Sequence, residues 1–394
     1  MGVVAYMSEK TYVGAVISDI HSGAMNGEEL LNELDKIFLK YLKSIKVLDF
    51  VVITGDLFDN KLSLNSEHTK TIFIFLKKLI DICVDHNAKL RIIKGTEFHD
   101  NRQLGLLKFV YNSNVDIKVY DTVSSEELFP DFNVLYIPEE YVSDKDAYYS
   151  SYFSHNYDMI FGHGLVNEVA FVAKMQESEV TMNKAPIFKT EELLNITKGP
   201  IFFGHIHKPQ CIKDRLYYIG SYSRWVYGEE EPKGFMMVAY TPTTGKYEVE
   251  FIENTLAPIY NTIVIDCNSQ FYKNDEEKQI DYIITMIKNL NLDRIRVIFN
   301  IPEDYPNPTL LTNILNDIFS KHKHIKIIIN NNSREKIKKR EMEEKIKTLL
   351  STYDFIFDKS ISTEEKISKF IKIKYNKDIS VGRMREYLYQ KINI

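Results

Sequence analysis

The 394-residue sequence contains only three cysteines, and they lie far apart. Cys83, Cys211 and Cys267 have no spacing that is typical of a metal site, a redox pair or a disulfide framework. Each is most simply explained as a small buried apolar residue. This use of cysteine suits a protein of the reducing cytosol.

Long apolar runs are also lacking. None reaches the roughly 18 residues that a membrane-spanning helix needs, and the first residues, MGVVAYMSEK, lack the layout of a signal peptide. With 44% hydrophobic and 27% charged residues, the composition is typical of a soluble globular protein. We therefore expect a cytoplasmic protein with no membrane association.

The charges form no marked basic stripe. The net charge is −5, but residues 333–394 carry 16 Lys and Arg against 10 Asp and Glu, a net charge of +6. The preceding 332 residues therefore carry 34 basic against 45 acidic residues, a net charge of −11. A mildly basic tail suits an acidic partner or nucleic acid, although a solvated helical face explains it equally simply. Charge alone does not indicate a nucleic-acid-binding protein.

The first 250 residues alternate between strand-like and helix-like segments. Asn26 begins one helix, with Glu29 as its capping-box partner, and residues 66–86 form a second amphipathic helix. Strands are expected at VGAVIS (13–18), FVVIT (50–54), LRIIK (90–94), VLYIP (134–138), MIFGH (159–163) and IFFGH (201–205). This alternation predicts an α/β sandwich whose helices cover buried sheets, with ligands at the strand ends.

The pattern changes after about residue 256. NTIVIDC (261–267), IRVIFNIP (295–302) and IKIIIN (325–330) read as strands, with helices around 280–287 and over 308–320 between them. Charged helices follow, one beginning after Ser362 with Glu365 as a capping-box partner, and a last one near 381–391. We therefore expect three domains, at residues 1–255, 256–332 and 333–394.

Carboxylates and imidazoles follow five of the expected strands. A lone Asp or His at a strand end is usually just a hydrogen-bonded polar terminus. Five such strand ends on one edge of a fold instead predict a functional site. The residues are Asp19, His21, Asp56, Asp59, His99, Asp100, His163, His205 and His207.

These residue types suit two neighbouring divalent ions. Two ions about 3.5–4 Å apart need a shared anionic bridge, a role that suits the carboxylate of Asp56. Pairs separated by one residue, Asp19 with His21 and His205 with His207, place both side chains on the same side of an extended strand end. Mixed oxygen and imidazole donors favour manganese, iron or zinc over a purely oxygen-bound magnesium.

The motifs D-x-H, G-D-x-x-D, G-H-G and G-H-x-H, in this order, resemble those of calcineurin-like metallophosphoesterases. YYIGSYSRWVYGEEEPKGFMMV (217–238) is similar to the segment that closes the phosphoesterase domain of SbcD-type nucleases. The resemblance covers about residues 13–240 by motif, and the later unit fits the capping domain of that family by layout only. It implies an α/β metallophosphoesterase sandwich flanked by helices, a small α/β capping domain and C-terminal helices.

The resemblance also implies a role for each site residue. Asp19, His21 and His207 would hold one ion, His163 and His205 a second, and Asp56 would bridge them. His99 would be the catalytic imidazole, and Asp100 would orient it. Asp59 would lie behind the ligands and bond either one of them or the strand turn. The cofactors implied are two divalent ions, manganese foremost with magnesium as an alternative. The implied reaction is in-line attack of metal-activated water on a phosphodiester.

An SbcD-type protein implies a DNA nuclease, with exonuclease or endonuclease activity, in DNA end processing, recombination and repair. Its partners would be DNA and an SbcC-type SMC-like ATPase that binds the C-terminal helices, with a homodimer inside a heterotetramer. Two other functions stay open. One is a phosphatase or small-molecule phosphodiesterase of the same fold, and the other is a partly degenerate scaffold subunit.

The third motif departs from the family pattern. The family reads Gly-Asn-His-Asp/Glu there, and the Asn oxygen completes the second metal site. Here KGTEFHDN (94–101) places Thr96, Glu97 and Phe98 between Gly95 and His99. Either Thr96, Glu97 or a water replaces the Asn in an active site, or the second site is weak. The presence of all other ligand types favours the first interpretation.

Overall fold

The computed structural model describes residues 10–100, 103–109, 114–169, 185–266, 294–301, 325–331, 361–375 and 377–380, with a few single positions besides. The chain divides into two compact units. The first comprises residues 1–262 and 291–296, and the second comprises residues 263–290 and 297–394. Within the described residues, no helix is long and apolar enough to cross a membrane.

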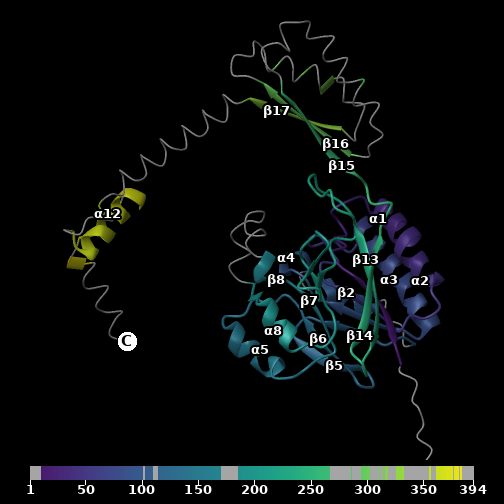
Figure 1. The fold of residues 1–394 in the computed structure, drawn as a ribbon. Coiled ribbons are helices and arrows are strands. Elements are labelled where there is room, and N and C mark those ends of the chain that lie inside the picture. The colour runs from purple at the N-terminus through teal and green to yellow at the C-terminus, as the bar shows by residue number, and fades with distance from the viewer. Residues whose placement is uncertain are drawn as a thin grey trace, which may run out of the picture. The chain divides into compact units, whose positions relative to one another are not determined.

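The first unit contains two six-stranded sheets (Figure 1). In the first sheet, β1 to β4 are parallel to one another, whereas β13 is antiparallel to β1 and to β14. Its order is β14 (Lys246–Glu253), β13 (Gly234–Thr241), β1 (Tyr12–Ile17), β2 (Phe50–Thr54), β3 (Lys89–Ile93) and β4 (Ile117–Tyr120). The parallel strands therefore end at one common edge.

The second sheet has a parallel centre and antiparallel edges. Strands β12, β10, β7 and β6 run parallel, and β11 and β5 flank them in the opposite direction. Its order is β11 (Gln210–Ile212), β12 (Leu216–Tyr218), β10 (Ile201–Gly204), β7 (Met159–His163), β6 (Phe132–Ile137) and β5 (Ser124–Phe129). A separate pair consists of β8 (Leu165–Val166) and β9 (Ile187–Phe188).

Helices cover the outer face of each sheet, which gives a four-layered sandwich (Figure 1). The first sheet packs against α1 (Gly27–Glu33), the π-helix η1 (Leu34–Leu39), α2 (Lys40–Ser44) and α3 (Glu67–His86). The second packs against α5 (Lys145–Phe153) and α8 (Thr190–Asn195). Two short helices, α4 (Glu97–Asp100) and η2 (Gln103–Phe109), follow β3. The expected α/β sandwich flanked by helices is confirmed.

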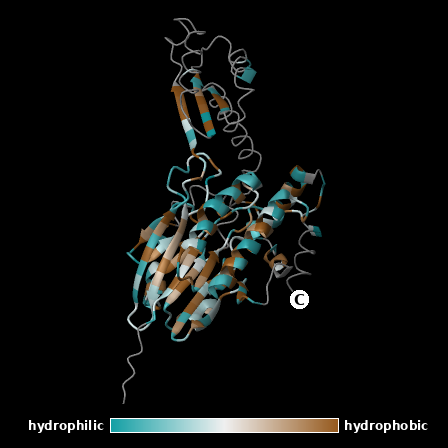
Figure 2. Ribbon diagram, turned by 90° about the vertical axis from the view of Figure 1, so that its right-hand side faces the viewer, coloured by the Kyte–Doolittle hydropathy of each residue, from teal (hydrophilic) through white to brown (hydrophobic). Residues whose placement is uncertain are grey.

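The central strands are largely apolar because both of their faces are covered. In β2, Val51 and Ile53 pack towards the helices, while Phe50 and Val52 pack between the sheets. Aromatic side chains fill much of the space between the sheets, and Figure 2 shows hydrophobic colour concentrated on the strands. These continuous apolar runs are what allowed the central strands to be expected from the sequence.

Local capping explains where the helices begin. The Asn26 side chain accepts hydrogen bonds from the Glu28 and Glu29 amides at 2.9 and 3.1 Å, as a helix N-cap does. The Glu29 carboxylate lies 3.1 Å from Arg294, a partner that the capping-box prediction did not include. Ser66 caps α3 through the Thr69 amide at 3.1 Å, in agreement with the predicted start.

All six strands expected in the first unit are present, to within about two residues at their ends. The strands not expected are β4, β5, β8, β9 and β11 to β14. Strands β11 and β12 are three residues long, and β14 alternates between exposed and partly buried residues. Such strands lack the continuous apolar run on which the predictions rested.

The second unit includes most of a three-stranded sheet of β15 (Tyr260–Asp266), β16 (Arg294–Ile301) and β17 (Ile325–Asn331). These strands match the expected strands of the small α/β domain. Helix α12 (Thr363–Tyr375) follows Ser362, whose hydroxyl accepts a bond from the Glu365 amide at 3.2 Å. The helices expected around 280–287, 308–320 and 381–391 lie mostly outside the described residues. The division at residues 255 and 332 stays a prediction.

A buried ion pair joins the two sheets. Arg91 of β3 is fully buried, and its Nε lies 2.6 Å from Oε1 of Glu126 in β5. Its Nη2 lies 2.9 Å from the Asp116 carboxylate. Burial alone would raise the pKa of Glu126, but hydrogen bonds from Arg91 and Lys118 outweigh burial and lower it to about 2. The stabilisation is therefore present above the usual Glu pKa of 4.5 and is lost as the pH falls towards about 2.

Replacing Arg91 with Met should lower the free energy of unfolding by about 3 kcal/mol at neutral pH, because the Glu126 carboxylate, only 11% exposed, loses its main partner. The Arg91→Met/Glu126→Leu double variant should lose less than the single variant. Lys118→Met is the matched control, since Lys118 is 49% exposed and should contribute less than about 1 kcal/mol. Urea unfolding measures all three, and an unchanged Arg91→Met variant would show that the pair does not stabilise the fold.

Candidate metal centre

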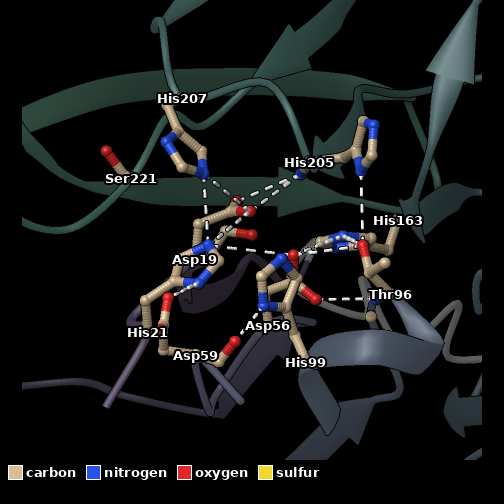
Figure 3. A network of polar contacts seen from close by, with 12 residues as sticks. Asp19, His21, Asp56, Asp59, Thr96, His99, His163, His205, His207 and Ser221 are labelled. Carbon is tan, nitrogen blue, oxygen red and sulfur yellow. Dashed lines mark hydrogen bonds and ion pairs between the residues drawn. The ribbon is translucent and has the colours of Figure 1, made fainter. Parts of the chain in front are cut away.

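The loops that follow β1, β2, β3, β7 and β10 meet at the edge where the parallel strands end (Figure 3). Backbone hydrogen bonds hold the first two loops together, from the Asp19 amide to Gly55 O at 3.1 Å and from the His21 amide to Asp56 O at 3.0 Å. In the second sheet, Gly204 of β10 pairs with His163 of β7. The topology therefore brings together side chains that lie nearly 190 residues apart.

Four of the predicted site residues have left-handed backbone conformations. The φ angles are 48° at Asp19, 45° at His21, 49° at Asp56 and 89° at His205. Residues other than glycine rarely adopt such angles, and the strain they carry is concentrated at functional sites in proteins. The loops thus hold costly conformations that aim these side chains inward.

Glycines next to the loops allow close approach of the chain. Gly55 has a φ of 93°, and a Cβ there would lie 2.3 Å from His163 Nδ1. At Gly95 a Cβ would lie 2.2 Å from the Asp56 amide and carboxylate. Any larger residue at these two positions would displace the side chains of the site.

One group of donor atoms consists of Asp19, His21 and His207. Nε2 of His21 lies 3.1 Å from Nε2 of His207, and each of these nitrogens lies 3.9 Å from Oδ1 of Asp19. Asp19 and His21 are buried, whereas the His207 side chain is 32% exposed. Solvent therefore reaches this group from the His207 side.

A second group consists of Asp56, His163 and His205, whose ligand atoms lie within 4.8 Å of one another. Oδ2 of Asp56 lies 3.2 Å from His163 Nε2 and 3.8 Å from His21 Nε2, so it faces both groups (Figure 3). Oδ1 of Asp56 accepts a hydrogen bond from the Thr96 amide at 2.6 Å. The structure thus brings all six predicted ligand residues together, and their binding of metal stays a prediction.

Hydrogen bonds fix which imidazole nitrogen faces the site. His163 Nδ1 donates to Thr54 O at 2.7 Å, which directs Nε2 at Asp56. His207 Nδ1 lies 2.9 Å from the Glu229 carboxylate, which directs its Nε2 at His21. Burial alone would lower the pKa of His163, but the charge of Asp56 raises it well above the ordinary value. The site therefore attracts positive charge.

The donor atoms fit divalent ions. Ligands of a four-coordinate ion with bonds of about 2.1 Å lie about 3.4 Å apart, and the donors here lie 3.1–3.9 Å apart. With Nδ1 of His207 turned to Glu229, the lone pair of its Nε2 points at Nε2 of His21, 3.1 Å away, where an ion could also be held. Mixed carboxylate and imidazole donors suit manganese, iron or zinc. Binding of an ion here would displace protons from the imidazoles.

His99 lies at the edge of the first group, on α4. Its ring is 4.6 Å from the His21 ring, and its Nδ1 contacts the backbone oxygen of Asp59. The carboxylate of Asp59 lies 3.5 Å from His21 Nδ1, which is the supporting position expected for it. His99 therefore lies beside the first group, with its orientation set by the Asp59 backbone, and its catalytic role stays a prediction.

Asp100 makes different contacts from those expected. Its carboxylate accepts hydrogen bonds from the amides of Leu57 at 3.1 Å, Phe58 at 3.3 Å and Gly95 at 2.7 Å. It thus joins the loop after β2 to the loop after β3. Asp100 could orient His99 only indirectly, through this backbone, because the hydrogen bond of the imidazole is with the backbone oxygen of Asp59.

Several residues of the site were not singled out in the sequence. Lys233 is buried, and its Nζ bonds His207 O at 3.0 Å and lies 3.4 Å from Glu229. Burial would raise the pKa of Glu229, but His207 and Lys233 lower it to about 2. Both residues belong to the 217–238 segment, for which the resemblance implies no role residue by residue. Glu139, two residues after β6, has no predicted role although it directly follows the expected strand at 134–138.

Residues 15–209 match the calcineurin-like phosphoesterase family. The chain contains a calcineurin-like metallophosphoesterase domain. The matched segment of the phosphoesterase domain includes all six predicted ligands and His99. The match of this domain supports metal-dependent hydrolysis of phosphoesters.

A search of curated proteins found no match. Among solved structures, one crystal structure is similar to this chain with 12% sequence identity and a TM-score of 0.35. The similarity covers 62% of this chain and 100% of the other. Another, TT1561 of Thermus thermophilus, is similar over the same shares, with 9% identity and a TM-score of 0.33. The assignment of the phosphoesterase domain rests on the family match and not on these likenesses.

Replacing Asp56 with Asn should weaken binding of both ions by at least about tenfold, because its Oδ2 faces both donor groups. Isothermal titration of the metal-stripped protein with manganese measures this. Asp146→Asn is the control, since the Asp146 side chain is 88% exposed. If Asp56→Asn kept the affinity and stoichiometry of the unmodified protein, Asp56 would not bridge the ions.

Proposed function

We propose that this protein is a DNA nuclease that hydrolyses phosphodiester bonds with two divalent ions, manganese foremost. The proposal rests on one observation, that the Asp56 carboxylate faces two donor groups while His99 lies beside the first. A single-ion site would not need a carboxylate between two sets of imidazoles. The family match supports the hydrolytic chemistry in its general form.

Each group of residues in the site would have its own role in phosphodiester hydrolysis. Ions held by the two groups would lower the pKa of water and neutralise charge on the phosphoryl oxygens. His99 touches Asp59 O through Nδ1, so its Nε2 is the atom that can exchange a proton with a leaving oxygen. Asp59, Glu229 and Thr54 fix the directions of the imidazoles.

Aromatic side chains beside the site support nucleic acid as the substrate. Phe98 is 66% exposed and adjoins His99, and the half-buried Trp225 lies 5.1 Å from the His21 ring. Exposed aromatic rings next to a phosphate site can stack on unpaired bases. A phosphatase or small-molecule phosphodiesterase would share the same metal chemistry, and it is the second candidate because the donor groups alone do not select a substrate.

The C-terminal helices are proposed to dock on an SbcC-type SMC-like ATPase, with two copies of this chain in a heterotetramer that processes DNA ends. Helix α12 supports this role, since Ile367, Phe370 and Ile371 are only half-buried and Ile373 is 44% exposed. An apolar helix stripe of this kind is what a coiled-coil partner binds. The charge of +6 over residues 333–394 is compatible with an acidic surface on that partner.

His99→Ala should bind both ions yet lose about 10²- to 10⁴-fold in the rate of hydrolysis, because the proton transfer is lost and the ligands remain. Cleavage of linear and hairpin DNA, with bis(p-nitrophenyl) phosphate in parallel, gives the rate, and manganese titration gives the binding. The exposed His155→Ala is the control.

Undiminished hydrolysis by His99→Ala would remove His99 from its role. Cleavage of the p-nitrophenyl ester without cleavage of DNA, with or without the ATPase, would instead favour the small-molecule phosphodiesterase. The two results are independent, since one concerns the imidazole and the other the substrate.

Deletion of residues 355–394 should abolish co-purification with the ATPase and leave manganese binding unchanged, because α12 belongs to the second unit and the donor groups to the first. Affinity capture of the tagged ATPase, followed by metal titration of the truncated chain, measures both. Continued capture of the truncated chain would move the docking surface elsewhere.

A further inference from the structure

Glu139 is a buried carboxylate whose place in the site is not explained by the sequence motifs. It lies two residues after β6, at the same edge as the ends of β7 and β10, and is 4% exposed. Its amide donates to Lys94 O at 3.3 Å, which joins the end of β6 to the end of β3. A glutamate is seldom so deeply buried unless it is paired or binds a metal.

The carboxylate is directed at the second donor group. Oε2 of Glu139 lies 3.4 Å from His205 Nδ1 and 3.5 Å from the Thr96 hydroxyl. That hydroxyl in turn lies 3.2 Å from Asp56 Oδ2 and 3.5 Å from each of His163 Nε2 and His205 Nδ1. Thr96 is therefore within 3.5 Å of all four neighbouring donors, at separations that adjacent ligands of one ion show.

Two buried carboxylates in one pocket need a compensating cation. Glu139 is 4% exposed and Asp56 is 2% exposed, and the Thr96 hydroxyl lies within 3.5 Å of both carboxylates. Within the described part of the chain, no Lys or Arg forms an ion pair with Glu139, and its ion-pair partner is the imidazole of His205. The hydroxyls of Tyr141 and Thr96 also bond this carboxylate but carry no charge, so a divalent ion would remove much of the cost of burying it.

Glu97, the other acidic candidate in the third motif, is directed elsewhere. Its side chain is 43% exposed, and its carboxylate lies 3.3 Å from Lys94 Nζ. It is thus paired at the surface, while Glu139 is buried against the imidazoles. Of the residues considered for the place of the missing Asn, Thr96 is the one that the loop brings into the group.

We propose that Glu139 is a ligand of the second divalent ion, beside Asp56, His163 and His205, with the Thr96 hydroxyl as its neighbour. The proposal deepens the proposed function and rests on its two-ion site. A carboxylate in this position gives the second group two negative charges, which favours harder ions such as manganese or magnesium over zinc.

The test is manganese titration of the metal-stripped protein by calorimetry, with electron paramagnetic resonance to count the bound ions. The unmodified chain should bind two ions, and Glu139→Gln should weaken one of them by at least about tenfold. Trp225 is the only tryptophan of the chain and lies 5.1 Å from His21, so quenching of its fluorescence reports on the first group. That quenching should be unchanged in Glu139→Gln.

Glu140→Gln is the matched control. Glu140 is a buried neighbour that accepts bonds from the Val123 amide at 2.8 Å and the Tyr148 hydroxyl at 2.7 Å, away from the donor groups. It should bind both ions as the unmodified chain does. Thr96→Val is a second variant, and it should weaken the same ion as Glu139→Gln does, which covers the case in which Glu139→Gln fails to fold.

The proposal is overturned if Glu139→Gln binds two ions with the affinity of the unmodified chain. If Glu139→Gln does not fold, the same result for Thr96→Val overturns it. A single bound ion in the unmodified chain would also overturn it. Loss of one ion in Glu139→Gln, while the unmodified chain binds two ions but cleaves no DNA, would support the ligand and refute the nuclease. The two failures are therefore distinguishable.

Discussion

The buried charge of Asp56 is the constraint on which the rest of the site depends. Burial alone would raise the pKa of this carboxylate, but His163 and His21 lower it well below its ordinary value. The carboxylate therefore stays ionised among imidazoles, with one oxygen held by the Thr96 amide and the other facing both donor groups. A charge in this position is tolerable only if its surroundings are fixed, because a small displacement would leave it unpaired.

The sandwich supplies that rigidity. Both sheets end at the site, and Asp100 joins two of the loops through three backbone amides. Left-handed conformations at Asp19, His21, Asp56 and His205 are strained, and packed sheets on both sides are what hold them. The Arg91–Glu126 pair adds a polar connection between the same two sheets. The packing that stabilises the scaffold therefore also fixes the geometry of the donor atoms.

Supporting residues explain why the 217–238 segment matters. Glu229 and Lys233 set the orientation of His207, whose Nδ1 would otherwise have no fixed acceptor. Trp225 from the same segment packs beside His21. The segment therefore does more than close the sheet through β13, because it also positions the most exposed ligand of the first group.

The sequence by itself determined the central strands, the helices that begin at Asn26 and Ser66, and the residue types at each strand end. Apolar runs covered on both faces and side chains with cap preferences leave local signals, as β2 and Asn26 show. Only the tertiary structure decided which of those residues meet. Asp100 contacts backbone amides rather than His99, and Glu139 lies at the second donor group because β6 and β7 are parallel neighbours. Contacts between residues distant in the chain depend on strand order and register, which no local pattern encodes.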